Sequence, residues 1–370
     1  MTKKSTLRTF HIFPQLTYPL QAAPLHKIPK MVTDGIDVLI RQCVKGIIGL
    51  PTTTVTDMFY SPRKYRGLAL LCCQWEKYLQ HFAIANKLKN LDDELLHQTC
   101  DFQSEIDECL STLSVTGQTS RHLRNELRNR SFETWCSRQW QGIGVKHFKT
   151  HTKTNSFIYD KNTLSSSEWT AAIKLNCNYA NLLGVPGNGE RNEPNLCRRC
   201  GRERETPSHV LGSCPFNDNH RTARHHRVKH SINSEMKRKD FICFDEAYAI
   251  DTELRHRFSD IIAIDRKSNN AYIIDPTVRY ENNHDDQDEQ INLEKVSIYE
   301  RCIPYYKQKF KEYGNREWSV IGLWFGSRGT VSSSVINFFD KFDLDKAALI
   351  KIAETVLIDS IQIINRHIYS

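Results

Sequence analysis

The tightest constraint in this sequence is a short run that holds three cysteines and one histidine. Cys197, Cys200, His209 and Cys214 have the spacing C-x2-C-x8-H-x4-C. Structural zinc takes four sulfur or nitrogen ligands in a tetrahedron, so this run predicts a structural Zn²⁺ site. Gly201 permits the turn that such a site requires after its second cysteine. The alternatives are a fourth ligand from the histidines downstream, or three reduced cysteines beside a surface histidine.

A basic segment follows, HRTARHHRVKH at 220–230, with four Arg or Lys, four His and no acid. Together with the arginines 198, 199, 202 and 204 it makes up what we call the basic strip. Such strips neutralise phosphates, and the net charge of +8 also favours an anionic partner. A solvated basic surface is the alternative. The residues expected to bind nucleic acid are Arg198, Arg199, Arg221, Arg224, Arg227 and Lys229. Replacing the last four should flatten the salt dependence by about three to four units.

Two aspartates flank a predicted β-hairpin in SDIIAIDRKSNNAYIIDPTVRYE (259–281). A symmetric hairpin centred between residues 267 and 268 places Ile262 opposite Ile273, and Asp260 opposite Asp275. Directly opposed side chains have Cβ atoms about 4.5–5.5 Å apart, and two carboxylates that close repel unless a cation lies between them. The pattern favours a Mg²⁺ site, with surface aspartates beside an ordinary hairpin as the alternative.

A third group is expected on the helix that follows the acidic loop, in NLEKVSIYERCI. Lys295 on this helix can reach the paired aspartates. Strand alternation places Arg279 on the face of Asp275, so this arginine competes with Lys295 for the third role.

The chain divides by pattern into four regions. Residues 1–150 are mostly helical, 151–194 form a linker helix and loop, 195–232 hold the zinc-binding segment with the basic strip, and 233–370 form a mixed α/β domain. Helical spacing of apolar residues predicts helices at 32–50, 66–90, 92–112, 120–141, 168–183 and 344–366, and residues 151–164 are expected to be a polar linker.

The apolar runs of the sequence are all far shorter than the roughly 20 residues of a membrane span. The start MTKKSTLRTFHIF lacks the apolar core of a signal peptide. We therefore expect an intracellular chain with reduced cysteines and no membrane partner.

The order of these motifs resembles one family, the polyproteins of site-specific non-LTR retrotransposons that carry a restriction-enzyme-like endonuclease. The C-terminal half of such polyproteins is similar to this chain over roughly residues 30–365. The matching segments are LPTTTVTDMFYSPRKYRGLALL (50–71), IKLNCNYANLLGVP (173–186), CRRCGRERETPSHVLGSCP (197–215), the block around the paired aspartates, LEKVSIYERCIPYYKQKF (293–310) and VIGLWFGSRGTV (320–331).

This resemblance implies a helical thumb and linker, a CCHC zinc knuckle, and an α/β domain of the PD-(D/E)xK nuclease type. It implies Cys197, Cys200, His209 and Cys214 as ligands of structural Zn²⁺. Asp260 and Asp275 would hold catalytic Mg²⁺, with Lys295 as the basic catalytic residue. Thr277 occupies the usual position of that lysine, and this branch of the family moves it to the next helix. A DNA target, the RNA of the element and a nuclear location are also implied.

The sequence contains no aromatic-x-Asp-Asp hairpin of the polymerase kind, so we expect no reverse transcription from this chain alone. The main hypothesis is a Mg²⁺-dependent endonuclease that nicks DNA to prime reverse transcription. One alternative is an inactive or domesticated fragment that binds nucleic acid without cutting it. Another is an inert fragment whose helical region exposes apolar surface.

Overall fold

The computed structural model describes residues 15–160, 162–190 and 193–370. The chain divides into two compact units, Met1–Ser137 and Arg138–Ser370. Residues 138–150, which the sequence pattern groups with the helical region, lie in the second unit. Among the described residues, no helix is both long and apolar enough to cross a membrane.

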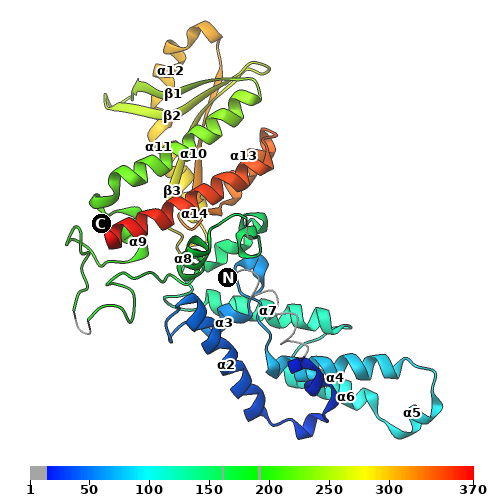
Figure 1. The fold of residues 1–370 in the computed structure, drawn as a ribbon. Coiled ribbons are helices and arrows are strands. Elements are labelled where there is room, and N and C mark those ends of the chain that lie inside the picture. The colour runs from blue at the N-terminus through cyan, green and yellow to red at the C-terminus, as the bar shows by residue number, and fades with distance from the viewer. Residues whose placement is uncertain (1–14, 161, 191–192) are drawn as a thin grey trace. The chain divides into compact units, whose positions relative to one another are not determined.

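The first unit is helical throughout its ordered elements (Figure 1). Its core lies between α4, α6 and α7, where Leu79, Phe82, Ile106, Cys109 and Leu123 are buried together. The elements are η1 (Leu25–Lys27), α2 (Lys30–Ile48), α3 (Thr56–Tyr60), η2 (Arg63–Tyr65), α4 (Cys73–Lys89), α5 (Glu94–Thr99), α6 (Phe102–Leu113) and α7 (Ser120–Cys136).

Three helix predictions that begin in this unit are wrong in their extent, and the helix predicted at 120–141 already ends at Cys136. The helix predicted from residue 66 begins only at Cys73, because residues 67–70 donate their backbone hydrogen bonds to carbonyls of residues 58–62 instead of forming a helix. A Cβ added at Gly67 would lie 2.2 Å from the Ser61 carbonyl oxygen. The helix predicted at 92–112 is two helices, α5 and α6, and each begins at an aspartate, Asp93 or Asp101, that accepts a hydrogen bond from the first turn.

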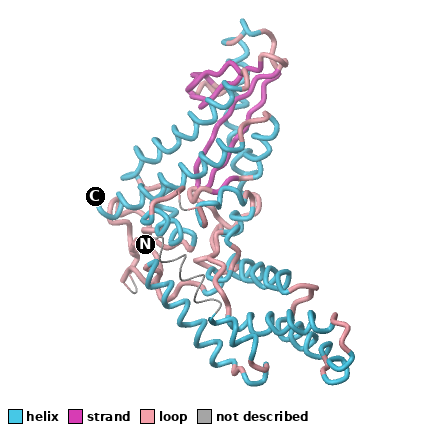
Figure 2. The backbone as a smooth tube through the Cα atoms, turned by 45° about the vertical axis from the view of Figure 1, so that its right-hand side comes forward, coloured by secondary structure: helices cyan, strands magenta, loops and turns pink. Residues whose placement is uncertain are grey.

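The second unit is built on one five-stranded sheet in the order β1-β2-β3-β4-β5. β1 (Phe241–Ile250), β2 (His256–Asp265) and β3 (Asn270–Arg279) pair antiparallel, β4 (Glu317–Gly326) runs parallel to β3, and β5 (Thr330–Val331) closes the edge. Figure 2 shows these strands with helices beside them. The parallel pair requires a crossover connection, and helices fill it.

The remaining elements precede the sheet, cross over between β3 and β4, or follow β5. Those before it are η3 (Val145–Lys149), η4 (Thr152–Ile158), α8 (Ser166–Asn176), α9 (Pro207–Gly212), η5 (Pro215–Asn217) and α10 (Asp218–Arg238). The crossover holds α11 (Gln287–Tyr299), η6 (Glu300–Cys302), α12 (Ile303–Lys309) and η7 (Lys311–Tyr313), and α13 (Ser333–Lys341) and α14 (Lys346–Tyr369) follow β5.

Strand alternation divides the sheet between two apolar cores. Ile261 and Ala263 pack with α10, α13 and α14, whereas Ile262 and Ile264 pack with α12. A sheet covered on both faces needs continuous apolar strands, which explains the run IIAI in β2. The predicted polar linker at 151–164 is wrong in part, because Phe157 and Ile158 of η4 are buried.

Candidate metal centre and acidic site

The four predicted zinc ligands come together in the second unit. The ligand atoms of Cys197, Cys200, His209 and Cys214 all lie within 4.8 Å of one another. Tetrahedral zinc, with bonds of about 2.3 Å to sulfur and 2.0–2.1 Å to nitrogen, would separate two sulfurs by about 3.8 Å and sulfur from nitrogen by about 3.5 Å. The Sγ atoms of Cys197 and Cys214 are 3.7 Å apart, and Cys200 Sγ lies 3.3 Å from His209 Nε2. These separations fit a zinc ion.

Local backbone geometry delivers these ligands. Gly201 adopts φ +64°, and its N–H donates to the Cys197 carbonyl at 2.8 Å, which closes the turn between the first two cysteines. Thr206 caps α9 by accepting from the His209 backbone N–H. The sequence prediction for Gly201 is confirmed by this backbone conformation.

The thiols of the cluster differ in how readily they ionise. His209 Nδ1 lies 3.1 Å from a Glu203 carboxylate oxygen, an arrangement that leaves Nε2 free to bind a metal. Burial and the charges of the neighbouring thiols raise the pKa of Cys214 to about 12. Burial opposes the ionisation of Cys200, but hydrogen bonds from the Arg202 backbone and from Cys197 lower the pKa of Cys200 to about 7. Closely spaced thiolates repel one another, and a divalent metal removes that repulsion.

The hairpin register is confirmed over four pairs, from Ile264↔Ala271 to Ile261↔Ile274. The ladder ends there, one pair before the aspartates, so Asp260 and Asp275 lie where β2 and β3 part. The β1–β2 ladder is also interrupted here, because Glu246, at φ +48°, and Asp260 opposite it do not pair, while the register stays the same on both sides, at Asp245↔Ile261 and Ala247↔Ser259.

The helix α11 supplies the expected third group. Lys295 Nζ lies 3.1 Å from Asp275 Oδ1, and both side chains are mostly buried. Burial raises the pKa of the Asp275 carboxyl, the Lys295 ammonium opposes this shift, and the charge of Asp260 adds to it. The competitor Arg279 instead forms an ion pair with Glu294 on the same helix. The structure thus brings Lys295, and not Arg279, to the acidic site.

Two side chains at the acidic site carry no signal in the sequence pattern. His225 on α10 lies with Nε2 3.1 Å from Asp260 Oδ1. The Tyr299 hydroxyl, one turn after Lys295, donates to the Phe258 carbonyl at 3.2 Å and lies near enough to Asp275 to influence the pKa of that carboxyl. His225 lay within the predicted set of alternative zinc ligands, but its contact is with the aspartate.

Comparison with known proteins finds similarity to retrotransposon polyproteins. A retrovirus-related Pol polyprotein from the type-1 retrotransposable element R2 of Popillia japonica is 22% identical over 359 residues, which cover 94% of this chain and 73% of that protein. The corresponding polyprotein of Nasonia vitripennis is 25% identical over 261 residues, 68% of this chain and 24% of that protein. The chain is a homologue of R2 Pol polyproteins. No protein-family model matches it.

Two cations of the basic strip do not have the exposed, phosphate-binding role that the sequence predicts. Arg224 is buried, and its guanidinium donates to Ser360 Oγ at 2.8 Å and to the Leu211 carbonyl at 2.9 Å. Lys229 is also buried and pairs with Glu246 at 2.6 Å. Both cations act inside the fold, so we remove them from the expected phosphate contacts.

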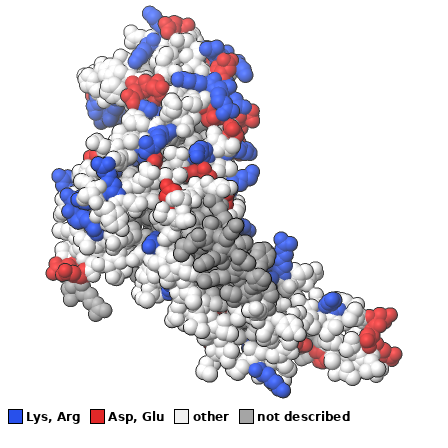
Figure 3. All heavy atoms as spheres, viewed as in Figure 1, with Lys and Arg blue, Asp and Glu red and all other residues white. Residues whose placement is uncertain are grey.

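The other members of the predicted set are more accessible but paired. Arg198 binds Glu205, Arg221 binds Asp218, and Arg227 binds Asp359. Arg199 donates to the His367 carbonyl and lies over the Phe216 ring. The basic residues exposed on this part of the chain are Arg202, Arg204, Arg227, Lys237 and Arg238. Figure 3 shows Lys and Arg side chains gathered where Figure 1 places the C-terminus and α9.

Proposed function

We propose that this chain is a metal-dependent DNA endonuclease that nicks target DNA for the reverse transcription of an R2-like retrotransposon. The observation that supports this most is the Lys295–Asp275 ion pair at 3.1 Å beside Asp260. Two carboxylates and a lysine meet where two strands part, on a mixed sheet, and the PD-(D/E)xK nucleases named by the resemblance use this combination of groups.

The donor set fits a hard divalent cation. Asp260 and Asp275 offer carboxylate oxygens, the ligands that Mg²⁺ prefers, and the mutual repulsion of their charges favours a cation between them. When bound, Mg²⁺ would supply positive charge for the phosphate and a more acidic water. Lys295 would orient the attacking water and offset the charge that develops on the phosphate. The ion pair with Asp275 holds the Lys295 ammonium beside the two carboxylates.

The partners follow from the same proposal. DNA is the substrate, the RNA of the element is the second nucleic acid, and the nucleus is where both would meet. The Cys/His cluster would hold a structural Zn²⁺, because four protein ligands leave no open position for catalysis. We expect no polymerase activity from this chain alone.

A plasmid-nicking assay with Mg²⁺ tests the proposal. Asp260→Ala and Asp275→Ala should each abolish nicking, and Lys295→Ala should reduce the rate at least about a hundredfold. Arg279→Ala is the matched control, since its guanidinium is paired with Glu294 on the outer face, and it should nick at nearly the wild-type rate. DNA binding by all four variants, measured by fluorescence anisotropy without Mg²⁺, should stay close to wild type.

The outcome separates the proposal from its main alternative. Wild-type protein that binds DNA and never nicks it would favour the non-cutting nucleic-acid-binding fragment, for which the well-formed Cys/His cluster is the supporting observation. Normal nicking by both aspartate variants would reject the assigned site.

A further inference from the structure

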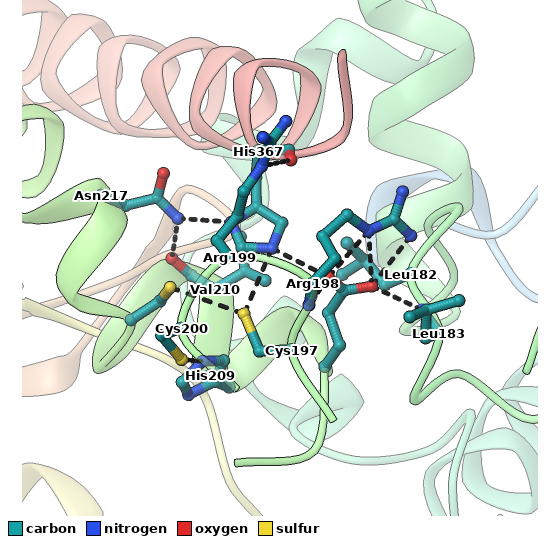
Figure 4. Close-up of polar contacts among 12 residues, drawn as sticks. Leu182, Leu183, Cys197, Arg198, Arg199, Cys200, His209, Val210, Asn217 and His367 are labelled. Atoms are coloured by element: carbon teal, nitrogen blue, oxygen red, sulfur yellow. Dashed lines mark hydrogen bonds and ion pairs between the residues drawn. The ribbon is translucent and has the colours of Figure 1, made fainter. Parts of the chain in front are cut away.

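A histidine from the last turn of α14 reaches the Cys/His cluster. His367 is fully buried, and its Nε2 lies 3.5 Å from Cys197 Sγ and 3.0 Å from Glu205 Oε1 (Figure 4). Cys197, Glu205 and His367 form a second group of close ligand atoms that shares one cysteine with the first. Nothing in the C-x2-C-x8-H-x4-C spacing points to this residue.

The hydrogen bonds around His367 fix its tautomer. Asn217 Nδ2 lies 3.1 Å from the Val210 carbonyl, which can only accept, so this atom is the amide nitrogen. The same Nδ2 lies 3.0 Å from His367 Nδ1, which must therefore accept. The ring proton is then on Nε2, directed at the sulfur and the carboxylate. The imidazole is a neutral donor toward Cys197.

Glu205 is held too firmly to act as a metal ligand in this second group. Its two carboxylate oxygens accept from the Arg198 side chain and backbone at 2.8–3.0 Å and from the Leu183 backbone at 2.7 Å. These bonds keep Glu205 ionised, as an acceptor for His367. The second group therefore lies next to the first cluster, with which it shares Cys197, and is not an independent metal site.

We propose that His367 is a positioning residue of the metal centre, whose Nε2–H donates to the Cys197 thiolate and joins the end of α14 to the zinc site. The contact is reciprocal, because Arg199, from the turn between the first two cysteines, donates to the His367 carbonyl at 2.8 Å. The helix that carries His367 is also tied to α10, since Asp359 and Ser360 of α14 accept hydrogen bonds from arginines of α10.

The test is the zinc affinity of the full chain, measured by competition with a chromogenic chelator. Loss of an outer-shell partner typically weakens metal binding about 10–100-fold, and His367→Ala should do so. His367→Gln keeps an N–H donor and should bind within a few-fold of wild type. Ile364→Ala is the control, because it removes a buried apolar group from the same helix without touching the cluster, and it should bind zinc as wild type does.

Replacement of zinc by Co²⁺ distinguishes positioning from direct ligation. The absorption bands of a three-sulfur, one-nitrogen site should keep their wavelengths in His367→Ala, since no ligand is lost. Bands that move to those of another ligand set would overturn the proposal. Unchanged zinc affinity in His367→Ala, or an equal loss in Ile364→Ala, would overturn it as well, as would a wild-type chain that binds no zinc.

Discussion

Arg224 offers a sharp test of whether the basic strip binds phosphate or holds the fold together. We expect Arg224→Met, which keeps the apolar stem and removes the guanidinium, to lower the free energy of unfolding. Two hydrogen bonds from a charged donor contribute about 1.5–3 kcal/mol each, and the burial of the charge offsets part of this. Removing both from this buried side chain should cost about 3 kcal/mol.

Arg227→Met is the matched control on the same helix. Its guanidinium is half exposed and pairs with Asp359, so its loss should cost less than about 1 kcal/mol. For DNA binding the order of the two variants is reversed, and Arg227→Met should have the larger effect. A phosphate contact contributes about 0.9 to the slope of log K against log salt concentration, so Arg227→Met can lower the slope by that amount, whereas Arg224→Met should leave it unchanged.

Two measurements on each variant decide whether the side chain binds phosphate or stabilises the fold. Denaturant unfolding of the zinc-loaded chain gives the stability, and anisotropy titrations of a labelled duplex at several salt concentrations give the slope. The fourfold replacement predicted from the sequence should then flatten the slope by about one to two units, less than three to four. A lower slope with unchanged stability in Arg224→Met would refute the reasoning.

Two further predictions concern the two sites. Elemental analysis should find one zinc per chain. Cys200→Ser should lose it and expose residues 195–232 to proteolysis, because binding of a structural metal contributes directly to the folding of the segment that holds it. Retention of zinc by this variant would contradict the ligand assignment. His225→Ala should lower the nicking rate by about tenfold or more, and His225→Gln should restore much of it, because the Nε2–H contact fixes the orientation of Asp260. His226→Ala, at the next position of α10, is the control and should nick normally.

Short-range patterns in the sequence predicted much of this structure. The turn between the two apolar runs predicted the hairpin register, because a symmetric hairpin pairs residues at equal distances from its centre. The ligand spacing at 197–214 was equally informative, since a metal knuckle is closed within one short segment.

The features that were not predicted either depend on contacts between distant parts of the chain or were misinterpreted from the sequence. Position 224 has the same helical spacing as Val228, Ile232 and Met236, so its burial could have been read from the periodicity, but its charge suggested a surface role. The end of the β2–β3 ladder before Asp260, and the gap in the β1–β2 ladder at the same residue, have no signal in the sequence of the hairpin itself. The contact of His367 with the cluster has no local sequence signature.

The contact between Cys197 and His367 joins positions that are 170 residues apart along the chain. During synthesis the four ligands at 197–214 leave the ribosome together, well before α14 exists. The metal can therefore be captured early by a local turn, while the imidazole that holds Cys197 arrives only after the sheet and its crossover helices have been made. With zinc as the proposed ion, the centre would bind its metal before its final hydrogen bond forms, and α14 would then stabilise a site that is already closed.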